Sequence, residues 1–310
     1  MRSSSATEMS PRRRGISRAR ARETLTGLAF IAPLLAGLAI FDLGPLVATI
    51  GESFTRSLGF GRSEWVGIAA YLDFFVDPVA LGAIVNTLLY SLGVLLGIPL
   101  ALLFAEALNR KGLRGRGIYR TLYFVPVITM TVAAAMVWKW IFNGEYGILN
   151  AALAVVGIDG PYWLTDRATV MLAMVIVGVW MSLGYNIVIY LAGLQAIPTD
   201  VYEAAELDGA GWIRRFVSLT VPMVSPTTAF LSVTTMISSL QMFDLVYIMI
   251  GPTNPAIDSA RTIVYMFYET GFIKQDRGHA AAIAVMVMLF ILVIALIQVR
   301  LQRRWTHYEV

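Results

Sequence analysis

Residues that could make or break covalent bonds are scarce in this chain, so binding is the chemistry to look for. The sequence contains no cysteine and only two histidines, His279 and His307. Thiolate metal sites, disulfides and thiol catalysis are therefore excluded, as is a histidine-rich metal centre. A Ser–His–Asp constellation has too few histidines to be assembled. We predict no catalytic residue and no metal site.

Side chains that could bind a solute lie inside long apolar segments. Polar residues within a membrane span are functional candidates by default. Ser, Asn and Gln also join neighbouring helices, so both roles remain open for these positions. The residues that offer aromatic faces and hydrogen-bonding groups are Trp180, Tyr185, Asn186, Ser239, Gln241 and Asp244.

Six apolar segments must position these side chains. The 310 residues are 57% hydrophobic and only 14% charged, too few charges for the surface of a soluble enzyme or a nucleic-acid-binding domain. A helix needs about 20 apolar residues to cross a bilayer. We expect spanning helices at about 25–50, 82–108, 121–142, 168–195, 219–247 and 279–301. Because backbone groups in lipid must bond within their own element, the predicted fold class is all-α and polytopic.

The distribution of Lys and Arg predicts the orientation. Six spans place both termini on one side of the membrane. Most basic residues fall in the N-terminal tail, the second-to-third and fourth-to-fifth connections and the C-terminal tail, so both termini are expected to be cytoplasmic. We expect residues 1–21 to form a disordered basic tail and residues 22–310 to form one transmembrane domain. Lys139, near the outer end of the third span, is expected to extend to the lipid headgroups.

The connection between the fourth and fifth spans, residues 197–222, begins as a short helix. Pro198 discourages continuation of the preceding helix. Asp200 is the expected N-cap, and Glu203 three residues later completes a variant of the capping box.

A tight turn and a second short helix follow. Gly209 and Gly211 permit a reversal of the chain. Helical spacing then places Trp212, Phe216 and Leu219 on one face. The sequence therefore predicts a compact helix–turn–helix, suited to docking into a groove on another protein.

This loop resembles the EAA loop of permease subunits of bacterial ABC importers. The matching positions are Glu203-Ala204-Ala205, then Gly209 after three residues, then Leu219-Thr220-Val221-Pro222 after nine more. The family pattern ends in Ile-x-Leu-Pro, so Leu219 and Val221 are conservative departures. In that family the loop is the coupling helix, which inserts into a cleft of the ATP-hydrolysing subunit. The resemblance implies coupling roles for Glu203, Ala204, Ala205, Asp208, Gly209, Arg214, Phe216 and Pro222.

Further segments are similar to permeases of carbohydrate importers, in particular the maltose and sn-glycerol-3-phosphate group. These segments are 30–33 with 44–45, 86–87, 120–126 with the following loop to 150, 251–255, 262–268 and 278–282. The segment 251–255 lacks one glycine and the usual threonine of that family. The resemblance implies import of a sugar or related polyol of the oligosaccharide or glycerol-phosphate class. The solute-binding candidates above would then line its path.

The resemblance also implies the partners. The sequence has no Gly-x-x-x-x-Gly-Lys-Ser/Thr phosphate loop and no Gly-Lys dipeptide, so we expect this chain to be no enzyme and to bind no cofactor. ATP with Mg²⁺ would act on two separate ATP-binding cassette subunits. A second homologous permease, an extracytoplasmic solute-binding protein and the lipid of a bacterial cytoplasmic membrane complete the expected set. No nucleic acid is expected.

Three other functions compete with this one. An ATP-driven permease for an amino acid or peptide shares the EAA loop, and only the weaker similarity outside the loop argues against it. An ion-coupled secondary transporter favours paired charges at the midplane and matched repeats, and neither is recognisable. A membrane enzyme needs a cluster of catalytic residues, which the composition does not supply.

Overall fold

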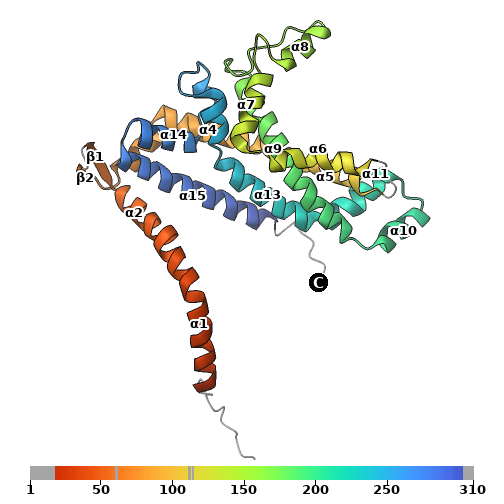
Figure 1. Cartoon of the computed structure of the whole chain (residues 1–310), viewed down its shortest axis with the longest axis horizontal. Helices are drawn as coiled ribbons and strands as arrows, with labels where there is room; N and C mark the ends of the chain where they lie inside the picture. Colours follow the sequence, from red (N-terminus) through yellow and green to blue (C-terminus); the bar gives the residue numbers. More distant parts are fainter. Residues whose placement is uncertain (1–17, 60–61, 111–112, 114, 303–310) are drawn as a thin grey trace, which may run out of the picture. The chain divides into compact units, whose positions relative to one another are not determined.

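The computed structural model describes residues 18–59, 62–110, 113 and 115–302. The chain divides into two compact units, Met1–Gly51 and Glu52–Val310. Helices make up most of both units, and a single β-hairpin occurs within the described part of the second (Figure 1).

In its described residues, the first unit is one nearly continuous apolar helix. It consists of α1 (Arg18–Leu38), a π-helical turn (Ala39–Leu43) and α2 (Gly44–Glu52). Its stretch Glu23–Glu52 has 30 residues and a mean hydropathy of 2.1, which is enough to cross a bilayer. The expected basic tail of residues 1–21 lies largely outside the described residues, and α1 already begins at Arg18.

The second unit contains the remaining elements. Its hairpin is β1 (Thr55–Gly59) paired antiparallel with β2 (Arg62–Trp65). Its α-helices are α3 (Ala69–Val76), α4 (Pro78–Leu95), α5 (Gly97–Asn109), α6 (Arg116–Ile128), α7 (Thr131–Ile141), α8 (Ile148–Val155), α9 (Val170–Gln195), α10 (Thr199–Leu207), α11 (Trp212–Arg215), α12 (Val221–Met223), α13 (Ser225–Leu240), α14 (Ile263–Tyr268) and α15 (Arg277–Gln302). Short π or 3-10 turns are η2 (Phe216–Thr220), η3 (Val246–Ile250), η4 (Ile257–Ser259) and η5 (Glu269–Ile273).

Three stretches of this unit are straight enough and apolar enough to span a membrane. They are Pro78–Asn109 (α4 with α5), Val170–Gln195 (α9) and Arg277–Gln302 (α15), with mean hydropathies of 2.3, 2.0 and 3.2. The first begins at a defined cap, because Asp77 Oδ1 accepts a hydrogen bond from Val79 N at 2.9 Å and Pro78 needs no donor in the first turn. With the helix of the first unit, four long apolar helices identify a polytopic membrane protein.

The third apolar segment is not the continuous helix expected over residues 121–142. The stretches Gly117–Ile128 and Thr131–Ile141 meet at 105°. Thr129 has extended backbone (φ −80°, ψ 130°), and its Oγ1 donates to Val125 O at 2.6 Å. Val125 O also accepts from Thr129 N at 3.1 Å, so both bonds close the last turn of α6. A threonine that bonds the preceding turn in this way is typical of a bent helix.

The fifth apolar segment is broken twice, so the continuous helix expected over 219–247 is also not present. Trp212–Met223 and Ser225–Leu240 meet at 66°, next to Pro226, which cannot donate a backbone hydrogen bond. After Leu240 the chain leaves the helix, and helical backbone resumes beyond Phe243. Counting each bent pair as one span gives up to six spans in the described residues.

Helix α9 is the centre of the second unit. It packs against α4, α5, α6 and α13 (Figure 1). Gly178 lets α4 approach closely, because a Cβ at this position would overlap the Tyr90 hydroxyl. One buried cluster joins α4 and α9 to the outer segments around Tyr265, and a second joins α5 and α9 to residues near Val224. This scaffold holds the two regions described next.

Candidate functional site

The loop after α9 turns on a single glycine. Gly209 has φ +74°, a conformation that glycine adopts without strain. Gly209 N donates to Glu206 O at 3.0 Å, and Ala210 N donates to Ala205 O at 2.9 Å. This pair of bonds is the Schellman motif that ends a helix. The predicted turn at Gly209 is therefore present, and α10 and α11 flank it (Figure 1).

The predicted capping box is wrong. Helix α10 begins at Thr199, so Asp200 lies within the first turn and cannot be the N-cap. The N-cap is Pro198, whose φ of −58° already suits the start of a helix and which has no side chain to bond the backbone. Asp200 still places a negative charge at the positive end of the helix dipole.

Aromatic and hydroxyl contacts hold the loop against the helices above it. Trp212 and Phe216 stack with ring centroids 5.6 Å apart, and Phe216 and Tyr202 pack against the buried cluster of α5 and α9. The hydroxyl oxygens of Tyr202 and Thr220 lie 3.0 Å apart in a hydrogen bond. Burial raises the pKa of Tyr202; the bond to Thr220 lowers it, and the nearby Glu106 carboxylate adds to the rise. The Tyr202 hydroxyl therefore stays protonated.

Two contacts of this loop were not predicted. The Arg110 guanidinium carbon lies 5.5 Å from the centre of the Trp212 ring, which links the loop to the inner end of α5. Glu206 Oε2 accepts from Arg215 Nη1 at 3.0 Å across the turn. Sequence spacing carries no signal for the first contact, because Arg110 and Trp212 belong to different connections.

The predicted coupling residues divide into an exposed and a half-buried group. The exposed group is Glu203, Ala204, Asp208, Gly209, Arg214 and Pro222. Ala205 and Phe216 are half-buried. The exposed group can meet a partner, whereas Phe216 joins the loop to the helices.

A cavity of about 490 Å³ lies between α4, α9 and α13. Five of the six predicted solute-binding residues line it: Tyr185, Asn186, Ser239, Gln241 and Asp244. Its wall also carries hydroxyl groups that the sequence analysis did not name for this role: Tyr90, Thr131, Ser182, Thr234 and Thr235. Hydroxyl, amide and carboxylate groups of this kind can hydrogen-bond a polar solute.

Asn186 is the most unusual residue of the cavity wall. Its side chain is fully buried, and neither its Oδ1 nor its Nδ2 has a hydrogen-bond partner among the described residues. A buried amide without partners costs about 1–3 kcal/mol. Asn186 therefore retains unused hydrogen-bonding capacity beside the cavity.

Trp180 does not line this cavity. It lies at a second, mainly apolar cavity of about 430 Å³ between α5, α6 and α9, together with Phe104 and Tyr123. Its ring also meets Trp138 edge-on, with centroids 5.7 Å apart. Helical periodicity explains the separation, because Trp180 and Tyr185 are five positions apart on α9 and face different neighbours.

The expected extension of Lys139 to the lipid headgroups stays a prediction, but the structure adds a contact within the protein. Its Nζ donates to Ile248 O in η3 at 3.1 Å. The π-helical turn offers a carbonyl that a neighbouring cation can satisfy, which no pattern in the sequence indicated. In the described residues, no group of three or more His, Asp or Glu side chains is arranged to hold a metal ion.

A family model described as "Binding-protein-dependent transport system inner membrane component" matches residues 93–307. The match covers the loop of α10 and α11 and the residues of the cavity wall on α9 and α13.

Curated relatives match almost the whole chain. The arabinooligosaccharides transport system permease protein AraP of Bacillus subtilis (strain 168) is 32% identical over 88% of this chain and 87% of its own length. The sn-glycerol-3-phosphate transport system permease protein UgpA of Yersinia pestis is 32% identical over 90% and 94%.

A solved structure has the same fold. It is a chain of a bacterial alginate ABC transporter in complex with an alginate pentasaccharide-bound periplasmic protein. It superposes with a TM-score of 0.82 at 23% identity and covers 96% of this chain and 100% of its own.

Proposed function

The chain belongs to the inner membrane components of binding-protein-dependent transport systems, and from this premise we propose that it is the permease subunit of an ATP-driven carbohydrate importer. Its solute is a sugar or related polyol of the oligosaccharide or glycerol-phosphate class, in line with the names of the relatives. The observation that carries the proposal is the loop between α9 and α13, which turns at Gly209. The same two helices also border the polar cavity.

The proposed topology has six spans in a bacterial cytoplasmic membrane, with both termini in the cytoplasm. Two bent helix pairs, counted as one span each, support that number. The basic connections support the orientation, because cytoplasmic loops carry an excess of Lys and Arg. The loop of α10 and α11 then faces the cytoplasm as an EAA coupling loop.

In this proposal the energy comes from outside the chain. Two ATPase subunits bind Mg²⁺-ATP, and their closure moves the exposed face of the loop, which includes Glu203 and Gly209. Phe216 and Tyr202 pass the movement to α5 and α9, because both pack on the cluster formed by these helices. The chain itself performs no hydrolysis.

The solute path in this proposal runs through the cavity between α4, α9 and α13. Sugar hydroxyls need several hydrogen-bonding groups, and the wall combines Asn186, Gln241 and Asp244 with hydroxyl side chains. Gln241 and Asp244 are exposed, so a solute reaches them first. A second permease of the same family completes the path, and an extracytoplasmic solute-binding protein delivers the solute, as the family description supports.

Co-purification tests the proposal. The chain is isolated with an affinity tag from its host in mild detergent, and the accompanying proteins and any bound solute are identified by mass spectrometry. We expect an ATPase, a second permease and a sugar-loaded binding protein. A binding protein loaded with an amino acid or peptide would contradict the substrate class alone. Isolation without any ATPase would contradict the proposal as a whole.

The path role of Asp244 has its own test. We expect Asp244→Ala to lose at least about tenfold in sugar uptake, because a charged hydrogen bond to the solute contributes about 1.5–3 kcal/mol. Co-purification of the partners serves as the control for assembly. Unchanged uptake in an intact assembly would remove Asp244 from the path.

A further inference from the structure

The outer rim of the polar cavity is an interruption in the fifth apolar segment. Helix α13 ends at Leu240, and residues 241–243 are not helical. Gln241 through Leu245 all line the cavity. Backbone carbonyls released by such a break need new donors, since lipid and apolar side chains supply none.

Thr262 supplies one of these donors from a distant segment. Its side chain is fully buried, and its Oγ1 donates to Met242 O at 2.9 Å. The same oxygen accepts from Tyr265 N at 3.3 Å and so caps α14. One hydroxyl therefore joins the non-helical rim to the start of another helix.

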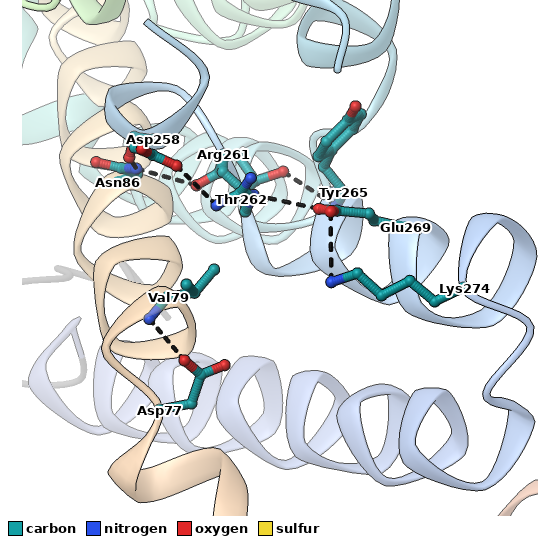
Figure 2. Close-up of polar contacts among 9 residues, drawn as sticks. All are labelled: Asp77, Val79, Asn86, Asp258, Arg261, Thr262, Tyr265, Glu269 and Lys274. Carbon is teal, nitrogen blue, oxygen red and sulfur yellow. Dashed lines mark hydrogen bonds and ion pairs between the residues drawn. The ribbon is translucent and has the colours of Figure 1, made fainter. Parts of the chain in front are cut away.

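Thr262 is itself held in place by α4, and Figure 2 shows the contacts that Asn86 makes. Asn86 Nδ2 donates to Asp258 O at 2.8 Å and to Arg261 O at 3.1 Å. Thr87 Oγ1 accepts from Ile263 N at 3.1 Å. Two adjacent α4 side chains thus fix the backbone on both sides of Thr262.

Ion pairs also hold Arg261, the residue directly before Thr262. Arg261 pairs with Asp258 at 2.9 Å and with Glu269 at 3.3 Å, and Glu269 also pairs with Lys274 at 3.4 Å (Figure 2). The Arg261 side chain is only 13% exposed, so this interaction is better shielded than a surface pair.

Lys139 holds the other end of the rim. Its bond to Ile248 O satisfies a carbonyl of η3, the turn that follows the non-helical residues. The rim therefore lies between two side-chain donors, one from α7 and one from the segment before α14. Neither Thr262 nor Lys139 lines the cavity.

We propose that Thr262 and Lys139 are positioning residues, which hold the interrupted segment 241–245 and thereby set the outer rim of the cavity. This inference deepens the proposed function, because the rim carries Gln241 and Asp244 of the proposed solute path. Removal of either donor frees a carbonyl and shifts the rim, while the rest of the fold stays in place.

Thiol labelling tests the inference without knowledge of the solute. Because the chain has no cysteine, Gln241→Cys introduces a single reporter at the exposed rim. The purified assembly is placed in lipid nanodiscs, and the rate of modification by N-ethylmaleimide is measured. Leu58→Cys on β1, which is 58% exposed, is the control reporter.

We expect Thr262→Val and Lys139→Met to change the labelling rate of the Gln241→Cys reporter by about fivefold, the factor that corresponds to one net hydrogen bond. Thr262→Ser and Lys139→Arg keep a donor and should restore the parent rate. The Leu58→Cys reporter should label at the same rate in every variant.

Two results would overturn the inference: a parent labelling rate at the rim in both Thr262→Val and Lys139→Met, or equal rate changes at both reporters. Should Thr262→Val fail to fold, Lys139→Met decides, since Lys139 is exposed and its loss leaves the core intact. The labelling result is independent of transport, so failure of this inference is distinguishable from failure of the proposed function.

Discussion

The turn at Gly209 and the cavity rim at 241–245 are both breaks between helices, but different interactions hold them. The turn itself is closed by the backbone bonds of Gly209 and Ala210 and by the pair Glu206–Arg215, nine positions apart. Contacts from farther away, such as that of Arg110 with Trp212, join the loop to the helices and do not close the turn. The rim is held from far along the chain: Thr262 lies 20 positions from Met242, and Lys139 lies 109 positions from Ile248.

This difference matches the movements that each region has to make in the proposed mechanism. A locally bonded turn keeps its shape when the helices around it move, which suits a loop that transmits force. A rim held by other helices shifts whenever those helices shift, which suits the entrance of a cavity. In the proposed mechanism the turn at Gly209 is thus the rigid interruption, and the rim at 241–245 is the responsive one.

The largest expected effect is a loss of stability when the long-range contacts behind the rim are removed. Asn86→Leu leaves the carbonyls of Asp258 and Arg261 without their shared donor. We expect the free energy of unfolding to fall by about 2–4 kcal/mol, since each unsatisfied buried group costs about 1–3 kcal/mol. Denaturant titration in mild detergent measures it, and Val85→Leu, at an exposed position of the same helix, is the control. An equal free energy of unfolding for Asn86→Leu and the parent would show that these long-range contacts do not stabilise the rim.

An intermediate effect is expected at the turn of Gly209. Gly209 has φ +74° and open space around its Cα, so Gly209→Ala adds backbone strain without a clash. A side chain in this conformation costs about 1–2 kcal/mol. We expect solute uptake per ATP hydrolysed to fall by about fivefold or more in the reconstituted importer.

Gly211 offers a matched control for that variant. It also has open space, but its φ is −65°. Gly211→Ala should therefore couple ATP hydrolysis to uptake nearly as the parent does. Equal coupling ratios for Gly209→Ala, Gly211→Ala and the parent would show that the shape of the turn does not matter for transport.

The smallest expected effect concerns the ion pair across the turn. Glu206 is 72% exposed in its side chain, so water and salt screen its bond to Arg215. Glu206→Gln should lower the free energy of unfolding by about 0.2–1 kcal/mol. The difference should shrink when the titration is repeated in high salt. A large loss that persists in salt would mean that the turn depends on this pair more than on its backbone bonds.

The distinction between local and long-range contacts also explains which features could be predicted from the sequence. The turn at Gly209 was predictable because its glycine, its flanking helices and its bonds all lie within one short segment. The apolar spans were predictable because a bilayer imposes their length. The cavity residues on α9 and α13 were found as polar groups in apolar segments, and five of the six line one cavity.

The failures lie where distant segments decide the structure. No local pattern indicated that Lys139 bonds Ile248, that Arg110 lies over Trp212 or that Asn86 holds the segment before α14. The breaks at Thr129 and after Leu240 were missed because an uninterrupted apolar sequence favours one straight helix. In the loop after α9, a preference for Asp over Pro as N-cap placed the predicted start of α10 too late.

The central claim is that this chain moves a solute only when a separate ATPase drives it. The most direct measurement reconstitutes the purified chain in proteoliposomes with its co-purified second permease, with and without the ATPase. The solute is the one recovered from the co-purified binding protein. We predict uptake only when the ATPase, the binding protein and Mg²⁺-ATP are all present. Uptake of the same solute by the chain without any ATPase would contradict the account.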